Sequence, residues 1–291
     1  MEARGWWWYD ILLVTGDAYV DHPGFGAAVI GRVLEHEGYR VAVLAQPDWR
    51  SARDFAAMGR PRLCVMAGSG NLDSMVARYT AAKRPRSEDF YSPGKKAGLR
   101  PDRAVIVYAN RAREAFPGLP VIIGGLEASL RRFAHYDYWD DAVRAGVLWD
   151  AGADLLVYGM GETASKEIAA LLKKKRPLSE LHGIRGTAYL TREPESECPF
   201  PHVELPGLEA VRSDRRAYAE AARLEFAEHD PVRGRALFQR HGTGRWWSTP
   251  PPCRWTAPPS TRCTSCPTHG GTIPTTKKTA ASPPLRRRAF P

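Results

Sequence analysis

Three glycine-rich loops carry side chains whose types and spacing could bind a small ligand. The loop at residues 16–26 places two aspartates and a histidine near Gly24 and Gly26, and the loops at residues 124–129 and 159–163 each place a glutamate beside two glycines. Glycine lets a backbone approach a ligand closely, and carboxylates and imidazole exchange hydrogen bonds and protons. The candidate site residues are Asp17, Asp21, His22, Gly24, Gly26, Gly124, Gly125, Glu127, Gly159, Gly161 and Glu162.

Each loop comes directly after an apolar run, so a parallel sheet would bring all three to one edge. Ligands bind at the carboxyl ends of the strands in such sheets. Single residues have simpler explanations, since Asp21 could cap a helix, His22 could form a local hydrogen bond, and tight turns need glycine in any case. Three loops at one edge nevertheless favour a crevice that takes an unidentified small molecule.

Other kinds of chemistry have less support. The first turn has no dinucleotide Gly-x-Gly-x-x-Gly, and we find no Gly-Lys-Ser/Thr phosphate loop and no nucleophile elbow. Residues 131–141 are dense in charge and aromatic rings, and pairing among these charges explains them as well as catalysis does. Cys263 and Cys266 have the spacing of half a zinc or redox site, which Cys253 and His269 would complete, but no strand or helix is expected to hold them. We expect no metal site.

The elements that must position these loops follow from hydrophobic periodicity. Apolar runs alternate with helical patterns, as in a parallel sheet covered by helices on both faces. The predicted strands are 10–15, 40–45, 63–67, 120–123, 153–158 and 183–190. The predicted helices begin after residue 26 and span 104–115, 139–151, 163–175 and 213–228, with Thr163 as a cap and Asn71 or Asp73 capping a further short helix. Residues 83–102 are predicted to form a long polar surface loop.

Composition changes sharply at His241. The last 51 residues hold ten Pro, ten Thr, eight Lys or Arg and no Asp or Glu. Removing those eight cations from the 42 of the whole chain leaves 34 against 32 acids, so residues 1–240 carry only +2 of the net charge of +10. A basic tail without periodicity argues against nucleic-acid binding, and no apolar run is long enough to cross a membrane. The default expectation is a cytoplasmic protein.

Three segments are therefore expected. Residues 1–190 form a flavodoxin-like α/β domain, residues 191–240 form a helical connector, and residues 241–291 form a disordered tail.

The segments that carry the candidate loops resemble YgiQ-type radical SAM proteins, in which an α/β amino-terminal domain precedes a radical SAM barrel. The resemblance covers about residues 4–240. It rests on LLVTGDAYVDHPGFGAAVIGRVLE, VAVLAQPDW, GRPRLCVMAGSGNLDSMVARYTA, RPDRAVIVYANR, GGLEASLRRFAHYDYWDD and ADLLVYGMGE.

The resemblance implies cofactors that this chain does not provide for. Family members hold a [4Fe-4S] cluster on a Cys-x3-Cys-x2-Cys motif, with S-adenosylmethionine on the open iron, and both belong to the barrel. This chain has no such motif and no barrel, so neither cofactor is expected here. The amino-terminal domain also resembles cobalamin-binding-type domains. His22 lies in the corresponding loop, but the residues around it depart from the usual pattern, so the resemblance does not establish cobalamin use.

Two functions remain open. The first is the amino-terminal domain of a YgiQ-type radical SAM protein of unknown substrate, cut short by a frameshift near Gly242 and inactive alone. Reading one base earlier from there converts the two tryptophan codons into valine codons and gives a more plausible continuation. The alternative is a free-standing flavodoxin-like module that binds a corrinoid, a nucleotide or a similar small ligand. A third possibility, nucleic-acid binding through the basic tail, predicts steep salt dependence.

Overall fold

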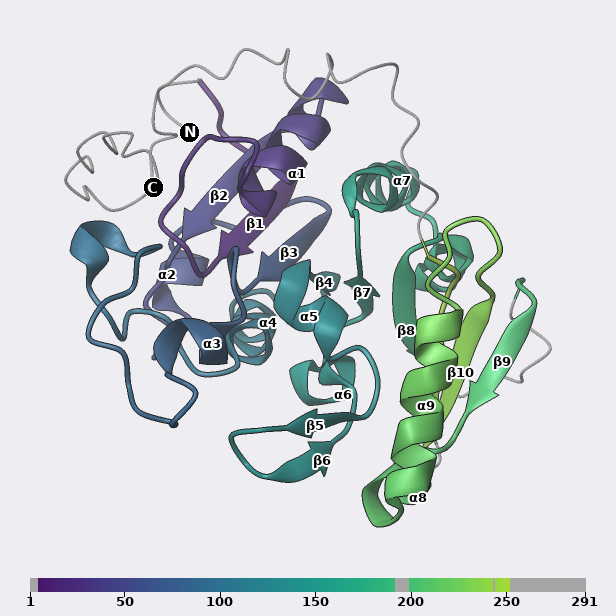
Figure 1. Ribbon diagram of the computed structural model, residues 1–291. Helices are drawn as coiled ribbons and strands as arrows, with labels where there is room; N and C mark the ends of the chain where they lie inside the picture. Colours follow the sequence, from purple (N-terminus) through teal and green to yellow (C-terminus); the bar gives the residue numbers. More distant parts are fainter. Residues whose placement is uncertain (1–4, 192–198, 243, 252–291) are drawn as a thin grey trace.

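The computed structural model describes residues 5–191, 199–242 and 244–251, and Figure 1 traces their arrangement. Their strands form one nine-stranded sheet in the order β2-β1-β3-β4-β7-β8-β11-β10-β9, beside a separate β5-β6 hairpin. The strands are β1 Ile11–Thr15, β2 Val41–Ala45, β3 Cys64–Gly68, β4 Val121–Gly124, β5 His135–Asp137, β6 Ala142–Arg144, β7 Leu155–Val157, β8 Thr187–Thr191, β9 His202–Leu205, β10 Ala236–His241 and β11 Gly244–Ser248.

The first half of the sheet is doubly wound. β2, β1, β3, β4 and β7 all run parallel, with Leu13 opposite both Val43 and Met66. This order is that of flavodoxin-like folds, in which the strand order reverses beside the first strand. The predicted α/β class and the first five predicted strands are confirmed.

Helices cover both faces of this half (Figure 1). α1 and α7 pack together on one face, while α2, α4 and α6 pack on the other. The helices are α1 Gly26–His36, α2 Arg53–Ala56, α3 Ser74–Arg78, α4 Ala104–Ala115, α5 Gly125–Leu130, α6 Val147–Ala151, α7 Glu162–Lys173, α8 Leu208–Ser213 and α9 Arg215–Ala227, with 3-10 turns at Pro93–Lys95 and Leu178–Gly183.

The alternation of side chains along each strand explains the two cores. In β1, Ile11 and Leu13 belong to the cluster under α1, whereas Leu12 and Val14 belong to the cluster under α4. Successive residues of a strand point to opposite faces, so a strand buried on both sides is apolar throughout. The carboxyl ends of the parallel strands therefore meet at one edge, where the predicted loops emerge.

The second half of the sheet corrects the predicted segment boundaries. β8 runs antiparallel to β7, and β11 lies between β8 and β10, antiparallel to both. One sheet thus continues across the boundary at 190/191 and the boundary at 240/241. Residues 202–205 and 236–241 are strands of this sheet rather than parts of a helical connector, and residues 244–248 are a paired strand rather than disordered tail. The rest of the predicted tail, residues 252–291, lies outside the described residues.

Two local predictions are also wrong. The helix predicted over 139–151 is instead β6 followed by α6, with Gly146 between them. Its first residues turn back to pair with β5, and Arg103 holds Asp137 and Asp140 at 2.8 and 2.7 Å. α7 begins at Glu162 after Gly161, without a side-chain cap from Thr163.

Within the described ranges, every helix is too short or too polar to cross a lipid bilayer.

Candidate functional site

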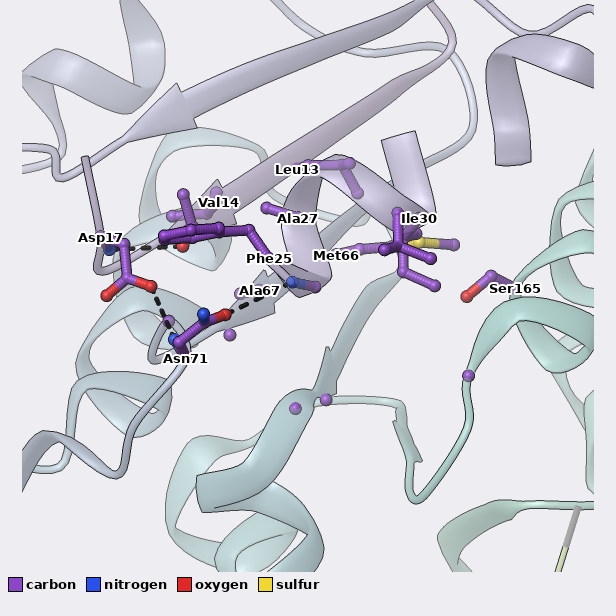
Figure 2. Close-up of a pocket in the computed structure, with 18 of the residues that line it drawn as sticks. Leu13, Val14, Asp17, Phe25, Ala27, Ile30, Met66, Ala67, Asn71 and Ser165 are labelled. Atoms are coloured by element: carbon purple, nitrogen blue, oxygen red, sulfur yellow. Dashed lines mark hydrogen bonds between the residues drawn. The ribbon is translucent and has the colours of Figure 1, made fainter. Parts of the chain in front are cut away.

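A crevice opens at the carboxyl ends of β1, β3, β4 and β7, beside the first turns of α1 and α7 (Figure 2). Its volume is about 310 Å³, near the lower limit of ordinary ligand pockets. All three predicted loops reach it. The predicted residues that line it are Asp17, Gly24, Gly26, Gly124, Gly125, Gly159, Gly161 and Glu162. The remaining three, Asp21, His22 and Glu127, are not lining residues.

The floor of the crevice is apolar because it is the α1 and α7 side of the sheet. Each of the four strands contributes one residue to this floor, namely Leu13, Met66, Ile122 and Val157. Ile30 of α1 faces them (Figure 2). Sequence reasoning concentrated on polar loop residues and missed these strand positions, although their place near each strand end is readable from the apolar runs.

A fourth loop, residues 69–73 after β3, completes the crevice, and the candidate residues omit it. The Asn71 side chain donates from Nδ2 to the Gly24 carbonyl at 2.8 Å and accepts the Gly26 N–H at 3.4 Å. Its backbone N–H donates to Asp17 at 2.6 Å. Asn71 thus joins the first loop to the fourth, while the neighbouring Asp73 caps α3 through the N–H groups of Met75 and Val76.

Asp17 belongs to a buried charge cluster rather than to an open catalytic position. Its carboxylate lies 3.0 Å from Arg100, which also pairs with Asp89 at 3.1 Å and donates to the Ser69 carbonyl at 3.0 Å. Burial raises the pKa of Asp17 to about 6, and the nearby Arg100 opposes that shift. Because Arg100 and Asp89 belong to the predicted surface loop 83–102, the cluster holds this loop against the strand ends. The polar composition of the loop does not reveal this role.

Two glycines make this close packing possible. A Cβ at Gly16 would lie 2.1 Å from the Ser69 carbonyl oxygen, and a Cβ at Gly70 would lie 2.1 Å from the Asp17 carboxylate. Gly70 also has a φ of +106°, a backbone conformation that side-chain-bearing residues rarely adopt. Gly16 and Gly70 therefore allow the first and fourth loops to approach each other closely.

Asp21 holds α1 in place. Its carboxylate forms an ion pair and two hydrogen bonds with Arg32, and it accepts the Tyr19 hydroxyl at 3.3 Å. The helix-cap explanation is not what the structure shows, because α1 begins at Gly26 after an N-cap residue, Phe25, that makes no side-chain cap.

His22 forms the local hydrogen bond that its simpler explanation anticipates. Its Nδ1 accepts the Gly24 N–H at 3.0 Å. A ring nitrogen that accepts a backbone N–H uses its lone pair, so in the neutral ring Nε2 carries the proton. Coordination of cobalt through Nε2 would require this bond to break. His22 therefore does not fit a cobalt ligand in this conformation.

Glu127 is structural. Its carboxylate is fully buried and accepts the Ser74 N–H at 2.8 Å and the Val105 N–H at 3.1 Å. These are first-turn amides of α3 and α4, which lack partners within their own helices. Burial raises the pKa of Glu127. From its sequence position, Glu127 was expected beside the crevice. Its side chain instead points away from the crevice and caps the first turns of α3 and α4.

The charged residues of the run 131–141 are largely paired, but with residues of other segments rather than with one another as the simpler explanation expects. Arg131 pairs with Asp73, and Arg132 contacts Glu225 of α9 at 2.8 Å. Asp137 is held by Arg103. These pairs join the hairpin and α5 to the rest of the fold.

No group of three His, Cys, Asp or Glu side chains that could hold a metal occurs in the described part of the chain. Cys64 lies in the core within β3, and burial raises the pKa of its thiol. The half-site at Cys263 and Cys266 lies outside the described residues.

Comparison with known proteins places this chain in a family. The chain belongs to the radical SAM N-terminal family, whose model matches residues 1–262. It is 51% identical over 232 residues to a UPF0313 protein of Clostridium botulinum (strain ATCC 19397 / Type A), covering 80% of this chain and 36% of the relative. A UPF0313 protein of Methanocella arvoryzae is 53% identical over 241 residues, covering 83% of this chain and 40% of the relative. The chain thus spans well under half of the length of these relatives.

A solved structure is also similar. It is the radical S-adenosylmethionine methyltransferase TsrM from Kitasatospora setae with cobalamin and a [4Fe-4S] cluster bound. The match has a TM-score of 0.41 and 23% identity, and it covers 62% of this chain and 27% of TsrM.

Proposed function

We propose that this chain is the amino-terminal part of a radical SAM iron-sulfur protein and that it is catalytically inactive alone. Radical SAM chemistry needs three cysteine thiolates on a [4Fe-4S] cluster, with S-adenosylmethionine on the open iron. The observation that carries the proposal is that the five cysteines nowhere have the Cys-x3-Cys-x2-Cys spacing. Cys64 does not fit a cluster either, since it is buried in the core. The cluster would belong to the additional length of the relatives.

Anaerobic reconstitution tests this proposal. The purified chain of residues 1–291 is incubated with ferrous iron and sulfide, desalted, and assayed for bound iron and for a cluster signal by electron paramagnetic resonance. The full-length Clostridium botulinum relative is the control. We expect the relative to retain a cluster and this chain to retain no stoichiometric iron. A chain that keeps about four irons would overturn the proposal.

We further propose that the change of composition after Gly242 is a frameshift. The support is the loss of all acidic residues from 241–291, and the ease with which the tryptophan codons become valine codons one base earlier. Sequencing the gene with its downstream DNA, and weighing the intact expressed protein, test this. A cluster motif in another frame downstream is expected. An uninterrupted frame with no cluster motif beyond it contradicts the frameshift.

A second candidate function is binding of a small ligand, a corrinoid or a nucleotide, in the strand-end crevice. The observation that favours it is the crevice itself, which four loops enclose over an apolar floor. A corrinoid there would bind without His22 as its cobalt ligand. Ala27→Trp, at the crevice wall in the first turn of α1, should abolish saturable ligand binding without unfolding the chain. If the ligand still binds to this variant, the binding site is not the crevice.

A further inference from the structure

We propose that Glu162 and Ser165 form a recognition pair that binds adjacent hydroxyl groups of a sugar, while the ring attached to that sugar lies on the apolar floor of the crevice. This inference rests on the second candidate function, that the crevice is a ligand site. It names the residues that recognise the ligand and the chemical class that they recognise, a ribonucleoside or a similar glycoside.

Most polar side chains that line the crevice already have partners within the protein. Thr15 accepts the backbone N–H of Asp17 at 3.3 Å, and the Tyr19 hydroxyl donates to Asp21 at 3.3 Å. The contacts described above occupy the side chains of Asp17 and Asn71. These four lining side chains therefore hold the loops together and leave little capacity for a ligand.

Glu162 and Ser165 of α7 are the exceptions among the lining side chains that carry nitrogen or oxygen. Within the described residues, neither the Glu162 carboxylate nor the Ser165 hydroxyl has a hydrogen-bond or ion-pair partner. Ser165 is only 4% exposed, and buried hydroxyl groups ordinarily have a partner. Its hydroxyl points into the crevice on the side of Ile30 (Figure 2). Both groups are therefore available to a ligand in the crevice.

The recognition pair lies on one face of α7. Glu162 and Ser165 are three positions apart, a spacing at which the side chains of a helix are neighbours. Helical side chains lean toward the start of their helix, so Ser165 lies over the first turn, and a Cβ at Gly161 would lie 3.9 Å from its Oγ. The same Cβ would lie 3.8 Å from Ile30 Cδ1. A ligand here meets two polar groups from α7 and hydrocarbon from α1.

The hydrogen-bonding capacity of the recognition pair determines the group that fits it. A carboxylate only accepts hydrogen bonds, whereas a serine hydroxyl donates and accepts. Glu162 lies in the first turn of α7, which has no side-chain cap, so the positive end of the helix dipole offsets its charge. The carboxylate therefore suits a neutral donor and does not require a cation. Adjacent hydroxyl groups meet both conditions, because one donates to Glu162 and the other exchanges a hydrogen bond with Ser165.

The floor of the crevice provides a place for the rest of the ligand. Leu13, Met66 and Val157 present an apolar surface to a ring that lies between α1 and α7. The volume of about 310 Å³ is at the small end of ligand pockets. A nucleoside suits this volume better than a larger cofactor does.

Matched nucleosides test the inference on the full chain of residues 1–291. Adenosine, guanosine and uridine are each compared with the 2′,3′-dideoxy counterpart by equilibrium dialysis or calorimetry, so that each pair differs only in two hydroxyl groups. At least one ribonucleoside should bind at least tenfold more tightly than its counterpart. That binding should be lost in Ala27→Trp, which fills the crevice.

Variants of α7 assign this preference to the recognition pair. Glu162→Gln and Ser165→Ala should each lower the affinity for the ribonucleoside at least threefold and leave the affinity for the dideoxynucleoside unchanged. Ser165→Ala removes only the hydroxyl, and alanine favours the helix, so the fold is retained. Glu167→Gln is the matched control, because Glu167 is an exposed acid of α7 outside the crevice lining. It should change neither affinity.

The outcomes separate the two proposals. Equal affinities within every pair, lost in Ala27→Trp, would overturn hydroxyl recognition while supporting the crevice as a ligand site. A preference for the ribonucleoside that survives both Glu162→Gln and Ser165→Ala would overturn the role of the recognition pair. Binding that is insensitive to Ala27→Trp would overturn both proposals. If no nucleoside binds, this inference is wrong, whereas the radical SAM proposal is untouched because it rests on the cysteine spacing.

Discussion

Arg100 and Asp17 form an ion pair 3.0 Å apart in which each side chain is only 3% exposed. Asp17 follows β1, while Arg100 stands near the end of the loop that precedes α4, so the pair joins two segments that are distant in sequence. Asp89, 3.1 Å from the same guanidinium, is its third member. Buried charges that depend on one another in this way tolerate the loss of a partner poorly. The first crevice loop owes its position to this cluster.

Removing the cation should destabilise the fold strongly. Arg100→Met leaves Asp17 and Asp89 buried without their counter-charge, so we expect the free energy of unfolding to fall by about 3–5 kcal/mol. Arg50→Met is the matched control, because Arg50 pairs with Asp48 at the surface with side chains 69% and 46% exposed, where a pair contributes about 1 kcal/mol or less. Denaturant unfolding measures both. Equal, small losses would show that the cluster does not hold the loop.

Asp17 should make stability depend on pH in mildly acidic solution. Its pKa is raised by burial to about 6, above the ordinary value of 3.8, so the folded protein holds the proton more tightly than the unfolded chain. The free energy of unfolding should therefore fall as pH rises from about 4 to about 6, by up to about 3 kcal/mol. Asp17→Asn should lose this component, so the two stability curves diverge across that interval. Parallel curves would contradict the raised pKa of Asp17.

Gly70 should tolerate no side chain. A methyl group there meets the Asp17 carboxylate at 2.1 Å and adds backbone strain at a φ of +106°, so Gly70→Ala should destabilise the protein by more than about 2 kcal/mol. Gly98 has a φ of +79°, and a methyl group added there would meet nothing within 4 Å, so this position isolates the backbone contribution. Gly98→Ala should lower stability by about 1 kcal/mol. If the two variants unfold at the same denaturant concentration, the close contact between Gly70 and the Asp17 carboxylate is contradicted.

Trp247 tests whether residues after His241 belong to the fold. Its side chain is 2% exposed and stacks on Phe238 with ring centroids 4.8 Å apart. Trp247→Ala should lower stability by about 3–5 kcal/mol, whereas Trp7→Ala, which alters a side chain that is 93% exposed, should have almost no effect. If Trp247→Ala leaves the stability unchanged, the predicted boundary at 240/241 would stand.

The strands of the first half could be predicted because each is a short apolar run between turn residues, and the bounds of α4 follow from its periodicity alone. β11 could not, because a Pro- and Thr-rich composition hides a paired strand. Tryptophan is nevertheless a strand-forming residue, and Trp247 fills the core beside Phe238.

The position of the candidate site could be predicted from the sequence, but the roles of its individual side chains could not. Glycines after three strands indicate a crevice because parallel strands end at one edge, and eight of the eleven candidate residues line it. The direction of each side chain depends on distant partners. Glu127 turns away to cap two helices, and Asp21 turns to Arg32, because amides and a guanidinium from other segments lie there. Arg100 was hidden within a loop that looks merely polar.

The most direct test of the proposed function is reductive cleavage of S-adenosylmethionine. The chain of residues 1–291 and the full-length Clostridium botulinum relative are reconstituted with iron and sulfide, then mixed anaerobically with S-adenosylmethionine and a strong reductant. Production of 5′-deoxyadenosine is measured. We predict that the relative produces it and that this chain does not rise above the protein-free background. Sustained production by this chain alone would contradict its assignment as an amino-terminal part that lacks the cluster.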